Sequence, residues 1–365
     1  MTATPRTTKL GPDQAALRAL LRRLAEASST EAYILSVYAD VRPQAHGQRP
    51  ADRPELTAAR HRLATIQESL PAHSSQRASL DDDLARIERT LEEEDLEGAG
   101  GLAIFACSRI GLWEVVRAAG AFDTQVAAGP TADLFQLARL LDDSVSAVVA
   151  IVDTNTCRLF VSRRGALREL PGPDEPPDEH RRHDQGGWSQ ARYQRHVDMQ
   201  DKRFAKEAAG AIEHLVERER AQHLILAGDE RAIPILEAEL TETVRGLVDQ
   251  VIHLPMRSNP DDVESEVAPI LAAIEESEAT DVADRAIAGW LAGGLGVVGV
   301  DATIAALELG QVDQLVIDES ARLDEELRTE LVRQAALTDA AIEVVRQHPG
   351  LAQHEGVAAT LRFRI

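Results

Sequence analysis

The chain has 365 residues and a net charge of -22, from 61 acidic against 39 basic side chains. This balance argues against a sequence-independent DNA-coating protein, which needs a basic face. Hydrophobic residues make up 44% of the chain and charged residues 27%, which is typical of a globular protein. The length suffices for two or three domains, and with only 3% aromatic residues the core must consist mainly of Leu, Val, Ile and Ala.

The cysteine content and the hydropathy of the chain indicate where in the cell the protein is located. Cys107 and Cys157 form no CxxC pair, and no HExxH motif occurs, so we expect no metal and no cofactor. Residues 1–13 lack the apolar core of a secretory signal. The longest apolar stretch, 286–300, has 15 residues with five glycines, whereas a membrane-spanning helix needs about 20. We therefore expect a cytoplasmic protein without membrane contact.

The apolar spacing in the first part of the chain predicts alternating helices and strands. Strands at 146–153 and 157–161 form a hairpin around Thr154–Thr156. A polar loop with four prolines, 171–187, precedes a long helix. The other predicted elements are helices at 14–27, 55–69, 79–94, 190–220 and 231–242, and strands at 31–38, 102–107, 223–227 and 250–254.

The last part of the chain is predicted to be a compact α/β/α domain that follows a linker at Asn259–Pro260. Its predicted helices are one at 262–276, a second that ends at 291, and two more at 301–309 and 323–336. Its predicted strands are at 314–317, 341–345 and 357–363. The fold class is thus α/β (α+β) with three domains. We place them at 1–140, 141–256 and 257–365, the middle one with a mixed sheet covered by helices.

A glycine-rich segment, Gly294-Leu-Gly296-Val-Val-Gly299, has the spacing of a dinucleotide-binding turn and precedes Asp318. That motif needs a strand before its first glycine. The preceding residues, 281–291, have helical spacing instead. We therefore interpret the segment as a tight turn between two helices.

One segment, Arg181–Lys206, concentrates positive charge. Its seven basic and three acidic residues give +4, against -26 for the rest of the chain. A solvated helix face would explain the charge alone. Ser189, however, is placed as the N-cap of a helix, and a glycine pair and two aromatic residues accompany the arginines. We predict that the following residues bind RNA phosphates and bases: Arg181, Arg182, Trp188, Ser189, Arg192, Tyr193, Arg195, Lys202, Arg203 and Lys206.

Residues 186–195, Gly-Gly-Trp-Ser-Gln-Ala-Arg-Tyr-Gln-Arg, resemble the central motif of the archaeal and eukaryotic class-one release factors. That motif reads Gly-Gly-Gln-Ser-Ala-Leu-Arg-Phe-Ala-Arg and aligns without a gap. Trp188 takes the place of the catalytic Gln, and Gln190 follows two residues later. The resulting Gly-x-x-Gln spacing, Gly187 to Gln190, is similar to that of the ribosome-quality-control peptidyl-tRNA hydrolases and their bacterial relatives.

The resemblance extends to the three domains of that superfamily. Residues 31–107 resemble its N-terminal domain, and residues 146–254 its ribonuclease-H-like middle domain. Residues 299–317 and 356–363 resemble its C-terminal α/β/α domain, which is like an RNA-binding protein. The stop-codon-reading sequence Asn-Ile-Lys-Ser is absent from residues 1–140, so we expect an activity that does not depend on a codon.

The resemblance implies a tRNA mimic that hydrolyses the ester between a peptide and tRNA in ribosome rescue. Gly186, Gly187 and Gln190 would be the catalytic group, with Gln190 holding the water, because an amide does not titrate near neutral pH. Arg192 and Arg195 would hold terminal phosphates. The implied partners are the ribosomal RNA near the peptidyl-transferase centre and peptidyl-tRNA, with a translational GTPase as a further candidate and no DNA.

Two alternatives remain open at this stage. A non-enzymatic hibernation factor would occupy the tRNA A site and protect the peptidyl-transferase centre. A generic interaction protein would carry the basic helix only as solvated surface. Retention of Gly186, Gly187 and Gln190 favours hydrolysis over both.

Overall fold

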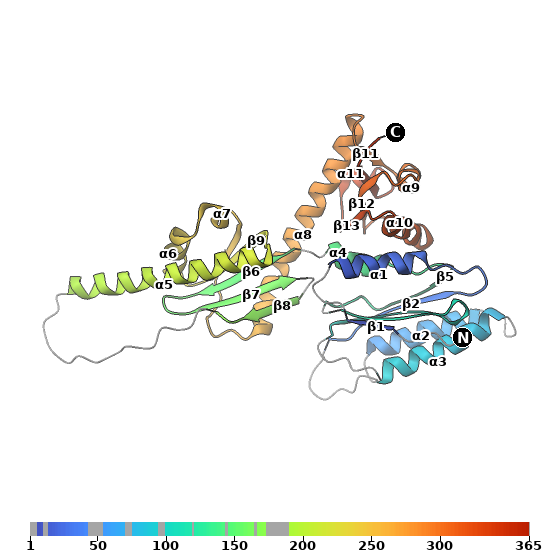
Figure 1. Cartoon of the computed structure of the whole chain (residues 1–365), viewed down its shortest axis with the longest axis horizontal. Coiled ribbons are helices and arrows are strands. Elements are labelled where there is room, and N and C mark those ends of the chain that lie inside the picture. Colours follow the sequence, from blue (N-terminus) through green and yellow to red (C-terminus); the bar gives the residue numbers. More distant parts are fainter. Residues whose placement is uncertain are drawn as a thin grey trace. The chain divides into compact units, whose positions relative to one another are not determined.

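The computed structural model describes residues 6–9, 14–42, 54–69, 75–93, 99–118, 120–142, 145–163, 166–172 and 190–364. These residues form a mixed α/β structure with three sheets, so the predicted fold class is confirmed (Figure 1). The contacts divide the chain into two compact units. Unit 1 comprises residues 1–143 and 275–365, and unit 2 comprises 144–274. The division into three domains stays a prediction.

Unit 2 is built on a five-stranded mixed sheet in the order β10-β9-β6-β7-β8. Strands β6, β7 and β8 are antiparallel, whereas β6, β9 and β10 run parallel to one another. The ribonuclease-H-like character of the middle domain stays a prediction. The strands are β6 (Ala147–Val152), β7 (Cys157–Arg163), β8 (Ala166–Leu170), β9 (His223–Gly228) and β10 (Val248–Ile252).

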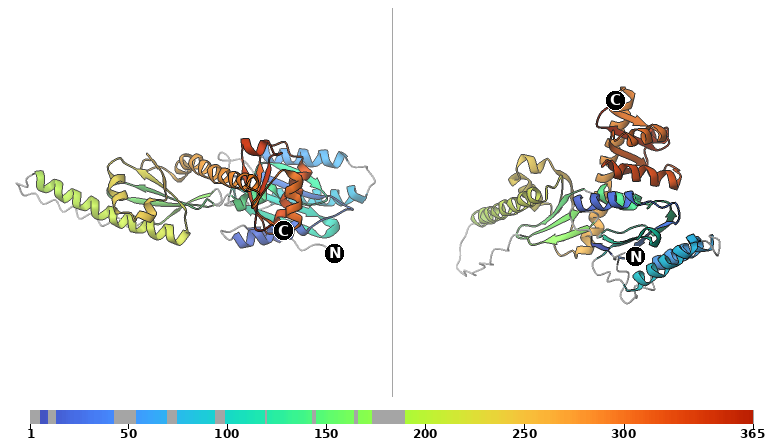
Figure 2. Two further views of the ribbon diagram at one scale, coloured as in Figure 1. Left: turned by 90° about the horizontal axis from the view of Figure 1, so that it is seen from above. Right: turned by 45° about the vertical axis from the view of Figure 1, so that its right-hand side comes forward.

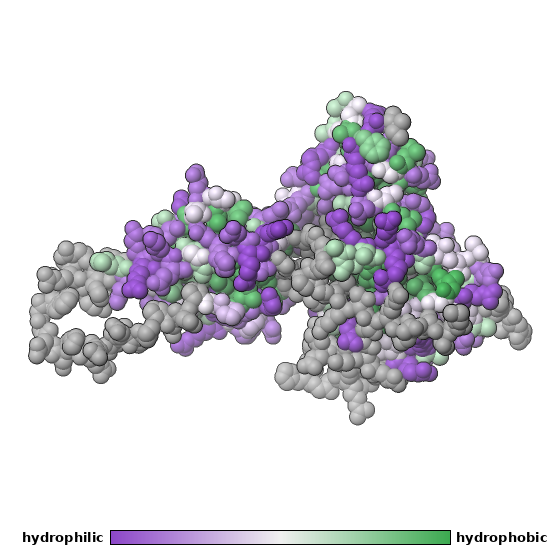
Figure 3. Space-filling model, in the orientation of Figure 1, coloured by the Kyte–Doolittle hydropathy of each residue, from purple (hydrophilic) through white to green (hydrophobic). Residues whose placement is uncertain are grey.

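Helices cover both faces of this sheet. The long helix α5 (Gln190–Glu219) packs on one face with α6 (Ala232–Glu239) and α7 (Glu242–Arg245), and its N-terminal turns continue past the sheet (Figures 1 and 2). The other face is covered by the first part of α8 (Pro260–Leu291), through Val263 and Val267. On the side shown in Figure 3, the surface around α5 is mainly hydrophilic.

Unit 1 contains two sheets. The first has the order β1-β4-β3-β2-β5, with β1 parallel to β4 and the other pairs antiparallel. Helices α2 and α3 pack on one face, and α1 and α4 on the other. The strands are β1 (Arg6–Lys9), β2 (Ile34–Asp40), β3 (Gly101–Cys107), β4 (Leu112–Ala118) and β5 (Gln125–Gly129), and the helices are α1 (Gln14–Glu26), α2 (Pro54–Ser69), α3 (Ser75–Glu93), η2 (Ser108–Ile110) and α4 (Phe135–Asp142).

The second sheet of unit 1 has the order β11-β14-β12-β13, in which only β12 and β13 are parallel. Helices α9 and α10 cover one face, and the last part of α8 with α11 covers the other. The remaining elements are β11 (Gly296–Val298), α9 (Val300–Glu308), β12 (Val312–Asp318), α10 (Glu325–Leu337), β13 (Ala341–Val345), α11 (Pro349–Ala352) and β14 (Val357–Leu361).

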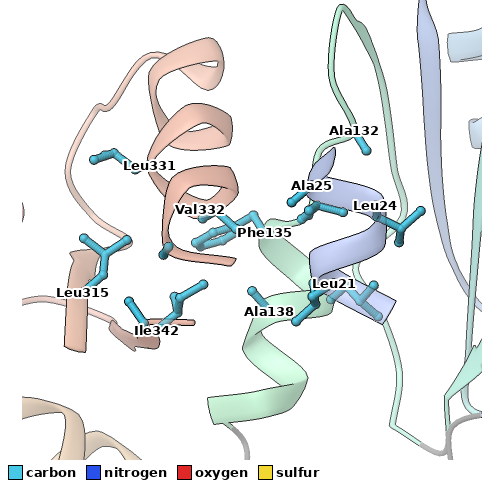
Figure 4. Close-up of a cluster of buried hydrophobic side chains, with 14 of the residues drawn as sticks. Leu21, Leu24, Ala25, Ala132, Phe135, Ala138, Leu315, Leu331, Val332 and Ile342 are labelled. Carbon is cyan, nitrogen blue, oxygen red and sulfur yellow. The ribbon is translucent and has the colours of Figure 1, made fainter. Parts of the chain in front are cut away.

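One hydrophobic cluster joins the two sheets of unit 1 (Figure 4). Leu21 and Leu24 of α1 and Phe135 of α4 share it with Val332 of α10 and Ile342 of β13. Burying leucine-sized side chains stabilises a fold by roughly 1.5–3 kcal/mol each. Segments from the beginning and the end of the chain therefore contribute to a single core.

Two expectations for the last third of the chain were wrong. Asn259–Pro260 is the start of a helix: Oδ1 of Asn259 accepts a hydrogen bond from N of Asp262 at 2.9 Å, and Pro260 is the first helical residue. From there α8 runs as one helix to Leu291, with Pro269 inside it. The glycine-rich segment also differs from a plain turn, since it contains the short strand β11 before Gly299, whose φ is 85°.

Candidate active site

The predicted site belongs to helix α5, and the second part of that helix is fixed in the core of unit 2. An apolar stripe of Phe204, Ala208, Ile212 and Leu215 is buried against β6, β7 and β9. These residues recur every three or four positions and so lie on one helix face. The sheet therefore fixes the second part of α5.

The structure locates the predicted site residues only in part. Gly186, Gly187, Trp188 and Ser189, together with Arg181 and Arg182, lie outside the described residues. Gln190 is the first residue of α5, and the backbone of its first turns carries Arg192, Tyr193 and Arg195. Their helical placement confirms the predicted start of the helix, whereas the catalytic role of Gly186, Gly187 and Gln190 stays a prediction.

Three further basic residues lie about three to four turns into α5. The side chains of Lys202, Arg203 and Lys206 are exposed. Nζ of Lys202 is 3.6 Å from Oε1 of Glu239, and Nε of Arg203 is 3.2 Å from Oε1 of Glu207. Exposed ion pairs of this kind contribute about 0–1 kcal/mol, so an RNA phosphate can compete with the carboxylates for these cations.

The N-terminus of a helix attracts anions, because its first backbone N–H groups have no partner within the helix and the peptide dipoles point their positive end there. In α5 that end begins at Gln190, directly after the glycine pair in the sequence. The arginines at 192 and 195 add positive charge to the same turns. This combination suits the phosphates of an RNA end or a developing oxyanion.

Asp201 is a buried carboxylate of α5 that the sequence pattern did not single out. It is 7% exposed, and Oδ2 accepts a hydrogen bond from Nη2 of Arg231 at 2.7 Å. Its position three residues before Phe204 continues the apolar stripe, which is the one sign of burial in the sequence. In the sequence it is one of the three acidic residues within Arg181–Lys206.

The side chains of the histidines near the motif lie outside the described part of the structure. His183 and Asp184 lie outside the described residues, and His196 lies in the first part of α5, where only the backbone is described. Within the described ranges no group of three or more His, Cys, Asp or Glu side chains is placed to hold a metal ion. No helix in that part of the chain is long and apolar enough to cross a membrane.

Comparison with known proteins gives a family match over part of the chain. Residues 133–283 match the family model of baeRF family 10, described as bacterial archaeo-eukaryotic release factor family 10. The matched stretch includes all of unit 2 and therefore the Gly186–Gln190 segment. The resemblance to the release-factor superfamily that the motif predicts is thereby confirmed. A search of curated proteins found no match.

Three solved structures illustrate the similarity. An archaeal translation termination factor, aRF1, is 19% identical over 98% of this chain and 99% of its own, with a TM-score of 0.28. Pelota from Archaeoglobus fulgidus is 16% identical over 72% and 80%, with a TM-score of 0.37. Dom34 from S. cerevisiae is 11% identical over 72% and 81%, with a TM-score of 0.39. At these values the likeness does not extend to activity.

Proposed function

We propose that the protein is a ribosome-associated, release-factor-like hydrolase that cleaves the ester of peptidyl-tRNA in ribosome rescue. The observation that carries the proposal is the motif Gly186–Gln190 at the start of α5, inside the stretch that matches the release-factor family. A helix built into the core of unit 2 can present this motif to a narrow RNA cavity. The glycines allow backbone conformations that other residues avoid.

The proposed chemistry is attack of water on the ester carbonyl at the 3′ end of the tRNA. The Gln190 amide holds the water, and backbone N–H groups of the glycine segment stabilise the oxyanion that develops. Removal of one such donor typically lowers kcat about 100- to 1,000-fold. Arg192 and Arg195 hold the neighbouring phosphates through charge-assisted hydrogen bonds.

We further propose that the activity is independent of the codon, because the sequence Asn-Ile-Lys-Ser is absent from residues 1–140. The proposed partners are the ribosome near the peptidyl-transferase centre and peptidyl-tRNA, with a translational GTPase as the factor that delivers the protein. The negative charge outside Arg181–Lys206 disfavours binding to other RNA.

The test is release of labelled peptide from stalled ribosome complexes by the full chain and by Gln190→Ala and Gly187→Ala. We expect both variants to bind ribosomes normally and to release peptide about 100-fold more slowly. Arg218→Ala is the matched control, because Arg218 lies near the other end of α5 and pairs with Glu219 at 3.0 Å. Ribosome binding without release would favour the hibernation reading, and release unaffected by Gln190→Ala would contradict the assigned role.

A further inference from the structure

Helix α5 changes its environment at Asp201. Met199, two residues before, is 73% exposed, whereas Asp201 and Phe204 are 7% and 6% exposed. The N-terminal turns of α5 continue past the sheet of unit 2 in two views (Figures 1 and 2). Asp201 therefore marks the point where the helix leaves the body of the unit.

An ion pair between the buried carboxylate of Asp201 and the half-exposed guanidinium of Arg231 holds the helix at this point. Nη2 of Arg231 donates to Oδ2 of Asp201 at 2.7 Å. Arg231 directly precedes α6, and its backbone N–H donates to Oδ1 of Asp229 at 2.8 Å, as does that of Ala232 at 2.7 Å. Because Asp229 fixes the backbone of Arg231, the pair ties α5 to a defined point at the start of α6.

The next residue of α5 contacts the opposite end of α6. Nζ of Lys202 lies 3.6 Å from Oε1 of Glu239, the last residue of α6. Two consecutive residues of α5 thus contact both ends of one short helix. Because the Lys202 pair is exposed and weak, the hydrogen bond between Asp201 and Arg231 is the main polar contact between α5 and α6 at this point.

Small rotations at this point matter at the other end of the helix. The distance along the axis from Gln190 to Asp201 is about 16 Å, at 1.5 Å per residue. A tilt of about 5° at Asp201 would move Gln190 by roughly 1.4 Å over that length. A displacement of 1 Å can cost about 100-fold in rate when a catalytic group must meet its target precisely.

We propose that Asp201 is a positioning residue, which through Arg231 sets the direction of the first turns of α5 and with it the position of Gln190 toward the ester. The inference rests on the proposed hydrolase function. It predicts that Asp201→Ala lowers kcat for peptide release about 10- to 100-fold with little change in KM or in ribosome affinity. Loss of RNA contacts would raise KM instead.

A double-mutant cycle separates positioning from general damage. If the pair acts as a unit, Asp201→Ala, Arg231→Ala and the double variant lose similar amounts of kcat. Asp201→Asn keeps the shape of the side chain and one acceptor oxygen, so its kcat should lie between those of Asp201→Ala and the wild type. This variant takes the place of Asp201→Ala in the cycle if Asp201→Ala does not fold. Arg218→Ala, on the same helix, should keep the wild-type rate. Additive losses in the double variant, or an unchanged kcat in Asp201→Ala, would overturn the inference.

A second measurement of the positioning role does not depend on hydrolytic activity. Spin labels at Gln194→Cys in α5 and Asn155→Cys in the β6–β7 turn report the direction of the helix within unit 2. We expect a narrow distance distribution in the wild-type background and a broader one with Asp201→Ala. An unchanged distribution would refute the positioning role even if release occurs. A broadened distribution with no release by the wild type would instead contradict the proposed function and leave the ion pair as an orienting contact.

Discussion

The guanidinium of Arg328 lies 4.5 Å from the ring centroid of Phe135, which joins α10 to α4 inside unit 1. Arg328 also acts on Asp133: burial raises the pKa of the Asp133 carboxyl, and the positive charge of Arg328 opposes that rise. Gln125 donates from Nε2 both to Asp133 at 3.1 Å and to Glu325 of α10 at 3.3 Å. Polar and apolar contacts thus unite residues from the two ends of the chain.

Removing the Phe135 ring should destabilise unit 1 as a whole. Phe135→Ala leaves a cavity in the shared core, and we expect the free energy of unfolding to fall by about 3–5 kcal/mol. Urea denaturation followed by circular dichroism measures it. Leu309→Ala is the control, because Leu309 is 60% exposed and should change stability by less than about 0.5 kcal/mol. Equal effects of both changes would contradict a shared core.

The two cysteines should report the opening of each unit separately. Cys107 lies in unit 1 and Cys157 in unit 2, and both are buried. Burial, with a smaller effect of Asp153, raises the pKa of the Cys157 thiol to about 12, and burial also raises the pKa of Cys107. Because the thiolate is the reactive form, neither should react with a thiol reagent at pH 8 in the native protein.

On unfolding, both thiols should react. Mass spectrometry of the labelled peptides along a urea gradient distinguishes the two sites. Phe135→Ala should shift labelling of Cys107 to lower urea and leave Cys157 nearly unchanged. Rapid labelling of either thiol in the native protein would contradict the burial of that cysteine.

Two glycines of unit 2 should respond to alanine in opposite directions. Gly228 has a φ of 152°, and a Cβ there would lie 1.9 Å from the backbone oxygen of Val152, its partner in β6. Gly228→Ala should therefore destabilise unit 2 by about 1–3 kcal/mol. Gly210, within α5, has open space around its Cβ position, so Gly210→Ala should stabilise by about 0.5–1 kcal/mol. Thermal unfolding of the two variants should show the opposite signs.

The Arg158–Glu169 pair should make part of the stability of unit 2 depend on pH. Arg158 donates to Glu169 at 2.7 and 2.9 Å and also to the backbone oxygens of Met256 and Ser258. These side-chain hydrogen bonds lower the pKa of Glu169 below its usual value of 4.5. A carboxylate with a depressed pKa stabilises the fold above its unfolded pKa, and the effect is lost as the pH falls through the folded pKa.

We expect Arg158→Leu to cost about 2 kcal/mol at pH 7, since the hydrogen bonds to the carboxylate and the two carbonyl groups are lost together. The difference in the free energy of unfolding between wild type and Arg158→Leu should shrink below pH 4.5, where the carboxylate becomes protonated. It should not vanish, because the wild type keeps its hydrogen bonds to the two carbonyl groups at low pH. Urea midpoints at several pH values measure it. Glu169→Gln is the control that should flatten the pH dependence.

Periodicity predicted the elements that bury a continuous apolar face. The stripe Phe204, Ala208, Ile212 and Leu215 defined α5, and the uninterrupted run 147–152 defined β6. The prediction missed β4 at Leu112–Ala118 and α4 at Phe135–Asp142, and it divided α8, which contains Pro269. These elements take their form from pairing and packing with distant segments, which local sequence does not encode.

The candidate site, too, could be predicted from the sequence only in part. The motif at 186–195 predicted where a helix begins, because Ser189 and Gln190 have the pattern of a helix start, and α5 does begin at Gln190. The burial of Asp201 was missed, because its partner Arg231 lies thirty residues away. A carboxylate next to an apolar stripe is as typical of a helix flank as of a buried ion pair, so spacing alone does not distinguish them.

The most direct test of the central claim is the single-turnover rate of peptide release by the full chain from ribosomes with a sense codon, a stop codon or no codon in the A site. The proposed function predicts release at similar rates in all three cases, and a loss of about 100-fold or more in Gln190→Ala in each of them. Absence of release in all three complexes, with the protein bound, would contradict the claim that the Gly186–Gln190 segment supports ester hydrolysis.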